Sequence, residues 1–400
     1  MHTATRIAFE ALPRIKRLAP RAHLAAYGLY APVNAARLRE QGVASIFGGE
    51  FEPQLLALAE GLADSGEAPP AREAQKVHFV VPDRSGLPAL ERYAHLDLPD
   101  GGRRVVGFAE GTRGCKHLCR HCPVVPVYEG RFRAVPLEVV MADIRQQVAA
   151  GAEHISFGDP DFLNGPTHAL RLARALHAEL PHVSYDATIK IEHLIDHADL
   201  LPELGDTGCV LITSAVESID DRVLGYLDKG HTRADFERAV ALTREAGIDL
   251  APTFIPFTPW TTREGYIELL RELVDLELVE AVPPIQLAIR LLVPEGSYLL
   301  RLEAFRALVG ELDPQILGYR WANPDAEVDA LQRRVMRWVE AAEGEGRLRR
   351  AIFEGIWRLA HEAAGRPAPA LPADLGPPIP AMSEPWYCCA EPTEQQLQSF

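Results

Sequence analysis

The sequence predicts an α/β fold whose main part is a partial (β/α)6 TIM-like barrel, with parallel strands inside and helices outside. From residue 104 onward, short apolar runs alternate with longer amphipathic stretches. Parallel strands need crossovers of about a dozen residues or more, and helices of that length supply them. Hydrophobic residues make up 47% of the chain and charged residues 24%, so a buried core is expected.

The first hundred residues are predicted to form a smaller α/β layer. Its expected elements are a helix over 5–18, a strand over 24–30, a helix over 32–41, a strand over 43–47 and a helix over 52–63. Two strands are too few to cover these helices, so the layer is expected to be incomplete and to leave an apolar sheet edge exposed. Residues 64–76 are polar and contain proline, as expected of a linker.

The barrel is predicted from six strands and the helices between them. The strands are expected over 104–110, 154–157, 183–189, 209–215, 249–254 and 285–292. The helices are expected over 137–150, 168–179, 220–227, 232–246 and 263–276. Residues 325–364 read as two further helices, and the proline-rich segment that follows is expected to be extended and poorly packed.

Charge and cysteine usage exclude several classes of protein. Lys and Arg total 41 against 56 Asp and Glu, a net charge of −15 that repels nucleic acid, so no nucleic-acid partner is expected. No apolar run is long enough to span a bilayer, and the first residues lack the features of a secretory signal. Six cysteines are too few for a disulfide scaffold, which favours a reducing cytoplasm and metal chemistry.

Three cysteines lie in one short loop after the first barrel strand. The stretch GCKHLCRHC places Cys115, Cys119 and Cys122 at x3 and x2 spacing. Three thiolates can hold three irons of a [4Fe–4S] cluster and leave the fourth open to S-adenosylmethionine (SAM), whereas ferredoxins supply a fourth cysteine. A zinc site completed by His117 or His121 is the alternative, although the spacing and the strand-end position favour the cluster.

This CxxxCxxC loop after a strand resembles the signature of the radical SAM superfamily. The resemblance extends over residues 104–300 and implies a [4Fe–4S] cluster, SAM and iron–sulfur radical chemistry. It places His121, the residue before the third cysteine, near the adenine. The stretch FGDPDF follows the second strand, where the family contacts the SAM amino group, which implies roles for Gly158, Asp159 and Asp161. The alternative is a turn shaped by glycine and proline.

Two further strand ends resemble SAM-binding positions of the superfamily. Lys190 and Glu192 follow the third strand, where relatives contact the SAM carboxylate or ribose; a solvated strand end is the alternative. Ser214 and Glu217, in ITSAVES, resemble a pattern that touches SAM. Here the alternative is helix capping by Ser218, a role that the following aspartate could also fill.

The tail PWYCCAEP makes the resemblance closer. It is similar to the CUAEP/CCAEP-tail radical SAM proteins, in which selenocysteine can occupy the position of Cys389. Vicinal cysteines such as Cys388 and Cys389 form only strained disulfides, and paired thiolates suit soft elements such as arsenic, selenium or copper. A redox or metalloid-handling catalytic role is the hypothesis, and an unimportant exposed tail is the alternative.

The N-terminal segment resembles the second half of a cobalamin-binding-type Rossmann domain. Its first strands are missing, and no Asp-x-His-x-x-Gly sequence is present to ligate cobalt, so cobalamin is a doubtful cofactor. The expected divisions are 1–76 for this incomplete domain and its linker, 77–103 for a connection and 104–300 for the barrel. A helical extension is expected over 301–365 and the Pro-rich tail over 366–400.

The leading functional hypothesis is a cytoplasmic radical SAM enzyme that cleaves SAM reductively and acts on a small or medium-sized organic substrate. A reducing donor such as flavodoxin or ferredoxin is the expected partner. The alternatives are SAM-dependent methyl or methylthio transfer and, outside enzymes, a zinc-binding metal-trafficking protein. Several basic residues around the cysteine loop are expected to be mostly solvated: Arg103, Arg104, Arg113, Lys116, Arg120, Arg131 and Arg133.

Overall fold

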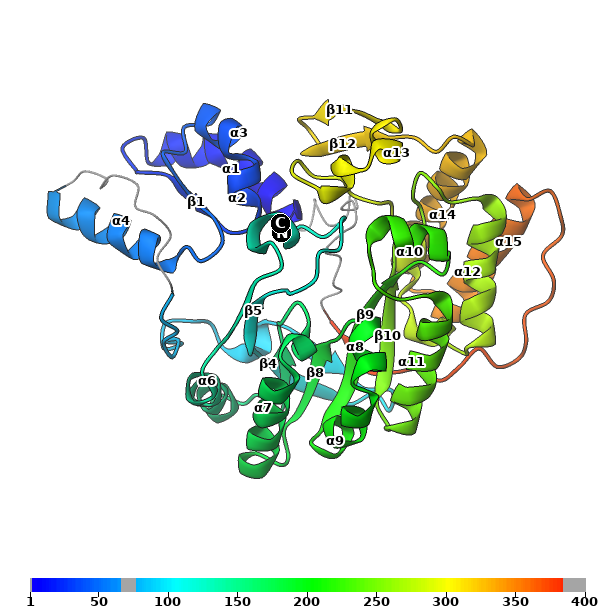
Figure 1. Cartoon of the computed structure of the whole chain (residues 1–400), viewed down its shortest axis with the longest axis horizontal. Coiled ribbons are helices and arrows are strands. Elements are labelled where there is room, and N and C mark those ends of the chain that lie inside the picture. Colours follow the sequence, from blue (N-terminus) through cyan, green and yellow to red (C-terminus); the bar gives the residue numbers. More distant parts are fainter. Residues whose placement is uncertain (1, 66–76, 384–400) are drawn as a thin grey trace.

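The computed structural model describes residues 2–65 and 77–383 of the chain. Its centre is a seven-stranded sheet in the order β10-β9-β8-β7-β4-β3-β13 (Figure 1). Five of these strands run parallel, namely β4 (Arg103–Ala109), β7 (His154–Phe157), β8 (Ser184–Thr188), β9 (Cys209–Glu217) and β10 (Asp249–Phe254). Two short strands, β3 (His95–Asp97) and β13 (Ala381–Met382), add antiparallel pairs at the β4 edge.

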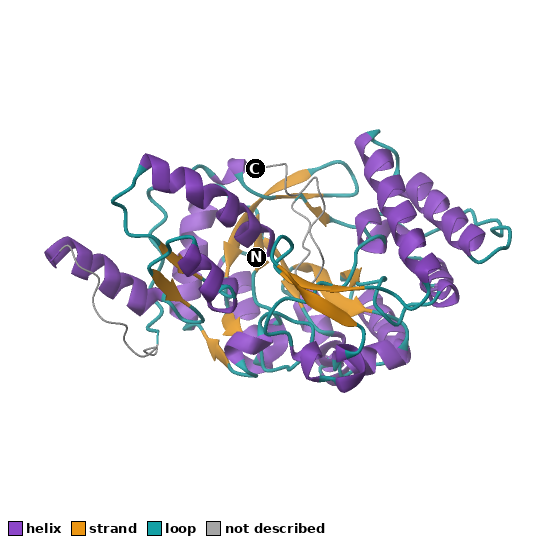
Figure 2. Cartoon of the chain, turned by 90° about the horizontal axis from the view of Figure 1, so that it is seen from above, coloured by secondary structure: helices purple, strands orange, loops and turns teal. Residues whose placement is uncertain are grey.

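Helices follow the parallel strands and cover the outer face of the sheet (Figures 1 and 2). They are α6 (Leu137–Ala149), α7 (Pro166–Glu179), α8 (Ile191–Asp196), α9 (Leu201–Asp206), α10 (Asp221–Leu227), α11 (Arg233–Glu245) and α12 (Arg263–Asp275). Except for α10, their apolar faces share one large core with the strands, in which Ile144, Leu176 and Phe236 are fully buried. Helix α10 packs in a second cluster with Ile255 and Phe305. The structure confirms the predicted α/β class with a curled, partial barrel.

The sixth predicted strand is wrong. Within 285–292 the chain forms a 3-10 helix (Pro284–Leu287) and then a single parallel bridge between Phe257 and Arg290. Pro283 and Pro284 have no N–H to donate to a ladder, so strand pairing cannot begin there. The apolar run is buried all the same, which explains why its composition resembled that of a strand.

The N-terminal residues form a separate small layer on one side of the barrel (Figure 1). Its elements are α1 (His2–Leu18), β1 (Ala25–Tyr27), α2 (Tyr30–Val33), α3 (Ala35–Glu40), β2 (Ser45–Phe47) and α4 (Glu52–Ser65). The two strands pair in parallel with each other. A small core of Leu12, Ala31, Leu38 and Val43 joins the helices to them. Most of the predicted linker, residues 66–76, lies outside the described residues.

The C-terminal part adds a hairpin and two long helices. The hairpin, β11 (Val309–Asp313) with β12 (Gly318–Trp321), was not predicted. It follows the short helix α13 (Glu303–Arg306) and precedes α14 (Ala326–Gly344) and α15 (Arg349–Ala363). Among the described helices, none combines the length and the apolar character needed to cross a membrane.

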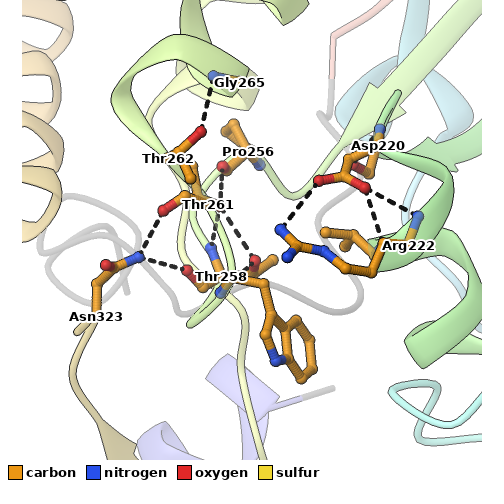
Figure 3. A network of polar contacts seen from close by, with 11 residues as sticks. Asp220, Arg222, Pro256, Thr258, Thr261, Thr262, Gly265 and Asn323 are labelled. Atoms are coloured by element: carbon orange, nitrogen blue, oxygen red, sulfur yellow. Dashed lines mark hydrogen bonds and ion pairs between the residues drawn. The ribbon is translucent and has the colours of Figure 1, made fainter. Parts of the chain in front are cut away.

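The segment after β10 is tied to the start of the C-terminal helices (Figure 3). The Asn323 side chain donates to the carbonyls of Thr258 and Thr261 at 3.1 and 2.8 Å. Thr262 caps α12 by accepting from the Gly265 N–H at 3.0 Å. The proline-rich segment is irregular and half-exposed over residues 366–383, in line with the prediction, but Leu375 is buried and β13 joins the main sheet, so it is not unpacked throughout.

Candidate active site

A small hairpin presents the cysteine loop. Strands β5 (Thr112–Gly114) and β6 (Phe132–Ala134) pair in antiparallel fashion and bring the two ends of the loop together. Gly114, directly before Cys115, has φ of 84°. A Cβ at this position would lie 2.5 Å from the Arg131 carbonyl oxygen. Only glycine therefore allows this tight closure.

The loop is also anchored to two distant segments. The Arg120 N–H donates to the Leu227 carbonyl at the end of α10 at 2.8 Å. The Arg120 carbonyl in turn accepts from the Leu299 N–H and from the Ser297 hydroxyl, each at 3.1 Å. The backbone between Cys119 and Cys122 is therefore held on both sides by groups that do not depend on a bound ligand.

The three predicted cysteine ligands are brought together. Burial, helped by charge repulsion from Asp161, Cys122 and Cys119, raises the pKa of the Cys115 thiol to about 12, although a backbone hydrogen bond from His117 opposes the shift. Burial likewise raises the pKa of Cys119, although Lys229 and Lys190 oppose this shift. Thiols that are buried and interact electrostatically suit a shared metal centre, because coordination supplies the positive charge that stabilises the thiolates. Two nearby lysines suit an anionic iron–sulfur cluster.

The predicted residues after β7 have separate environments. Gly158 lies against Phe108, whose ring would be 2.0 Å from an added Cβ. Asp159 is buried and accepts from the Gly111 N–H at 2.8 Å and from the Thr112 hydroxyl at 2.5 Å. Burial nevertheless raises the pKa of Asp159 to about 7. Asp161 caps the turn after it by accepting from the Leu163 N–H at 3.2 Å.

Asp161 belongs to a buried group that includes two histidines and the predicted pair after β8. Its Oδ2 lies 2.7 Å from the His193 Nδ1 and 3.4 Å from the His117 Nε2. Burial opposes ionisation, but the two imidazoles outweigh it and lower the pKa of Asp161 to about 2. Lys190 donates to Glu192 at 2.5 Å and lies 3.2 Å from the His117 Nδ1. Lys190 and Glu192 are thus partly buried and paired, unlike a solvated strand end.

A second buried group surrounds Glu217 at the end of β9. Its carboxylate lies 3.0 Å from the His121 Nε2 and 3.7 Å from the Lys229 Nζ. Burial alone would raise the pKa of Glu217, but Lys229 and His121 outweigh it and lower that pKa. Glu217 also has φ of 71°, a strained value for a residue with a side chain. Ser214, on the same strand, is fully buried, and its hydroxyl has no hydrogen-bond partner among the described residues.

A cavity of about 1210 Å³ opens on one face of the sheet. Alternate residues of the parallel strands line it, as the pleat of a strand requires. Its polar wall contains Ser156, Asp186, Thr188, Thr213 and Thr253, and Gly158 and Asp159 also line it. Asp186 lies 3.0 Å from the His154 Nε2 and accepts from the Ser156 hydroxyl at 3.2 Å. The sequence motifs do not identify this group. Alternating polar positions indicate which side chains share a face of one strand, but the order of the strands brings these residues together.

The candidate residues therefore divide between three places. Gly158 and Asp159 line the cavity. His121 and Glu217 meet at the cysteine loop, and Ser214 is buried on the same strand as Glu217. Lys190 and Glu192 lie beside His117, which joins them to Asp161. Cys388 and Cys389 lie outside the described residues.

Six of the seven basic residues near the loop bind protein groups, although none of the seven is buried and the side chains of Arg103 and Arg131 are 64% and 76% exposed. Arg113 pairs with Glu52 and Glu110. Arg133 pairs with Glu50 at 2.9 Å, and Arg104 donates to the Ser184 hydroxyl at 2.6 Å. Three further ion pairs involve Arg103 with Asp97, Arg120 with Asp228, and Arg131 with Glu129.

Residues 110–273 match the model of the Radical SAM superfamily. A tRNA-2-methylthio-N(6)-dimethylallyladenosine synthase of Chlorobium phaeovibrioides is 32% identical over 178 residues, 41% of this chain and 38% of that protein. The enzyme of the same name from Desulfosudis oleivorans is 26% identical over 278 residues, 67% of this chain and 55% of its own. The chain thus spans about half or less of the length of these curated relatives.

Solved structures with a similar fold include two enzymes. TsrM, a radical SAM methyltransferase from Kitasatospora setae, has a TM-score of 0.54 and 23% identity over 67% of this chain and 56% of its own. OxsB, a cobalamin-dependent SAM radical enzyme, has a TM-score of 0.67 and 16% identity over 84% of this chain and 57% of its own. At these identities the likeness concerns the fold.

Proposed function

We propose a radical SAM activity for this chain, whose residues 110–273 match the radical SAM superfamily model. The observation that supports it most is the gathering of Cys115, Cys119 and Cys122 on one anchored loop after β4. These residues would hold the [4Fe–4S] cluster that the superfamily implies. When bound, the reduced cluster supplies one electron that cleaves SAM into methionine and a 5′-deoxyadenosyl radical, which takes hydrogen from a substrate.

The chain's own residues would position SAM at the strand ends. Asp159, on the cavity wall, offers a carboxyl group to the SAM amino group. The buried pairs around Glu217 and Lys190 hold charged groups close to Cys119, since both lysines act on its thiol. Their roles toward SAM are part of this proposal. We propose no role for cobalamin, because the resemblance to OxsB concerns the fold.

The cavity is the proposed substrate site. Its volume of about 1210 Å³ exceeds the range of about 300–1,000 Å³ typical of small-molecule pockets, so SAM and a further organic molecule would both find room. Asp186 places a carboxylate on the wall, and three threonines add hydroxyls. A substrate with a cationic or hydrogen-bond-donating group fits this wall.

Anaerobic reconstitution with iron and sulfide tests the activity. The expected result is a brown protein that forms 5′-deoxyadenosine from SAM when dithionite, flavodoxin or ferredoxin supplies electrons. Alanine at Cys115, Cys119 or Cys122 should abolish both the colour and the product, whereas alanine at the buried Cys209 should leave both in place. A colourless zinc protein that leaves SAM intact would instead support the metal-trafficking alternative.

Methylthio transfer is the second candidate, because the two relatives compared above are named as tRNA methylthio synthases. The net charge of −15 weighs against RNA as the substrate. Incubation of the reconstituted protein with SAM, a sulfur source and tRNA distinguishes the two. A methylthio mass gain on a nucleoside would favour this candidate, and 5′-deoxyadenosine formation without any RNA product would favour the first.

A further inference from the structure

We propose that His117, Asp161 and His193 form a mononuclear site for a divalent transition-metal ion, separate from the three cysteine ligands. His117 belongs to the cysteine loop, Asp161 to the turn after β7, and His193 to helix α8. The site would therefore join three elements that are distant in the sequence. It takes no ligand from the cysteines and does not depend on the proposed SAM chemistry.

The ligand atoms converge as the ligands of one ion do. The Asp161 Oδ2 lies 2.7 Å from the His193 Nδ1 and 3.4 Å from the His117 Nε2. Nitrogen and oxygen ligands bind such ions at about 2.0–2.2 Å, so atoms that share an ion lie about 3 Å apart. The His117 Nε2 also lies 3.2 Å from the His193 Nε2, a contact that ion binding would replace. One carboxylate oxygen and one nitrogen from each imidazole, all within 4.8 Å of one another, are placed to share a single ion.

Two of these atoms lack a hydrogen bond although they are deeply buried. The Asp161 and His193 side chains are each 2% exposed. Neither the Asp161 Oδ2 nor the His193 Nδ1 has a partner with hydrogen-bond geometry among the described residues. At a separation of 2.7 Å only misalignment prevents a hydrogen bond between them. A carboxylate oxygen and an imidazole nitrogen that are this close and this deeply buried, yet lack hydrogen-bond geometry, are accounted for by an ion that binds both.

The surroundings also suit a cation. The other Asp161 oxygen accepts from the Leu163 N–H, which orients Oδ2. The far nitrogen of His117 lies 3.5 Å from a Glu192 carboxylate oxygen, and a carboxylate in this position commonly supports a metal-bound histidine. The Lys190 Nζ lies closer, at 3.2 Å from the same nitrogen, and donates to it in the structure. With an ion on Nε2, that nitrogen would carry the proton and donate to Glu192, with which Lys190 already pairs. The two carboxylates together leave a negative balance for the ion to offset.

The donor set indicates the class of metal. Two imidazoles and one carboxylate suit zinc or ferrous iron and leave coordination positions open, as in two-histidine, one-carboxylate sites. The ion would link the cysteine loop to the ends of β7 and β8. Its expected role is to order His117, and with it the backbone between Cys115 and Cys119.

Metal content of the reconstituted full-length protein tests the site. After zinc is added and the excess removed, the wild type should hold about four cluster irons and one further ion, zinc or a fifth iron. His193→Ala should lose that further ion and keep its iron–sulfur absorption. His197→Ala, which changes a neighbouring histidine outside the group, should keep both. A wild type without the further ion, or a His193→Ala protein that retains it, would overturn the proposal.

A chain that lacks the loop and tail thiols and keeps only the buried Cys209 separates this result from any loss of the cluster. Serine replaces every cysteine of the loop and the tail: Cys115, Cys119, Cys122, Cys388 and Cys389. Cobalt(II) should then bind stoichiometrically, with the visible absorption of a nitrogen–oxygen site and without thiolate charge transfer. It should also raise the melting temperature. Asp161→Asn or His193→Ala in this background should weaken cobalt binding at least about tenfold. Unchanged binding in both variants, with the apo proteins folded, would refute the site.

Discussion

Single buried residues near the cysteine loop depend on their neighbours for their charge state. Glu217 stays ionised because Lys229 and His121 face it in the interior. His231, two positions after Lys229, is instead held in its neutral form. Burial, together with Lys229 and Lys190, lowers the pKa of His231 to about 3, although Glu217 opposes the shift. Its two ring nitrogens have no hydrogen-bond partner among the described residues.

We expect His231 to make the protein sensitive to mild acid. In the folded chain the pKa of His231 is about 3, against an ordinary value of 6.5. Between pH 6.5 and pH 3 the unfolded chain therefore takes up a proton that the folded chain does not. The free energy of unfolding should therefore fall by about 2 kcal/mol between pH 7 and pH 5 on this account. Denaturant unfolding of the wild type and of His231→Leu at both pH values measures it. An equal fall in the two proteins would show that other groups are responsible.

Asp186 is the residue expected to recognise the substrate. Given a small-molecule extract, the reconstituted wild type should consume one component in step with 5′-deoxyadenosine formation. Asp186→Asn should still cleave SAM but consume that component at least about tenfold more slowly, because a carboxylate that pairs with a charged group contributes roughly 1.5–3 kcal/mol. Mass spectrometry of the extract gives both rates. Loss of SAM cleavage in the variant would instead place Asp186 at SAM.

At the scale of elements, local chemistry determines where the barrel helices begin. Asp220, not Ser218, caps α10, since its carboxylate accepts from the Arg222 and Val223 N–H groups at 2.9 and 3.4 Å. Ser218 instead accepts from the Asp220 N–H at 3.0 Å. Helix α10 matters to the site because its last carbonyl, that of Leu227, holds the cysteine loop.

Removal of the α10 cap should destabilise the helix and loosen the loop. Asp220→Ala is expected to cost about 1 kcal/mol of unfolding free energy, whereas Ser218→Ala should cost a few tenths. Hydrogen exchange at the Arg120 amide should rise more in Asp220→Ala than in Ser218→Ala. A larger effect from Ser218→Ala would show that the serine, not the aspartate, supports the helix.

For the whole molecule, charged contacts connect the N-terminal layer to the hairpin that carries the cysteine loop. Arg113 and Arg133, on β5 and β6, pair with Glu52 and Glu50. Arg37 donates to the Pro314 carbonyl at 2.7 Å, a contact with the C-terminal hairpin. These contacts are partly exposed, so each contributes at most about 1 kcal/mol. The N-terminal layer is therefore expected to open more easily than the barrel.

Combined alanine substitution of Glu50 and Glu52 should release the N-terminal layer. We expect faster hydrogen exchange in α2 and α4 and little change in the barrel strands. Glu179→Ala, which breaks an exposed barrel ion pair with Arg145, is the matched control and should leave the N-terminal layer unchanged. Uniform acceleration across the whole chain would indicate global destabilisation instead.

The tail cysteines follow closely in the sequence after residues that line the cavity. Residues 379–383 line the cavity, and Cys388 follows Ser383 by five positions, which an extended chain spans in about 17 Å. Cys389→Ser is expected to lower product formation while leaving SAM cleavage intact, and chromatography of 5′-deoxyadenosine and product measures both. Unchanged product formation would show that the tail is dispensable.

The sequence by itself determined the features that depend on neighbouring residues. The spacing of Cys115, Cys119 and Cys122, the five parallel strands and their helices follow from local periodicity and turn chemistry, which act over a few residues. The failed sixth strand shows the limit, because a buried apolar run has the same composition in a strand and in a 3-10 helix.

Only the tertiary structure decided which polar side chains meet. His117 and His193 are 76 positions apart, and Asp186 meets a histidine from the preceding strand. Such contacts depend on sheet order and on the path of the connecting loops, which no local pattern encodes. The docking of residues 366–383 was hidden for the same reason, because its buried Leu375 and its pairing with β3 involve partners far away in the chain.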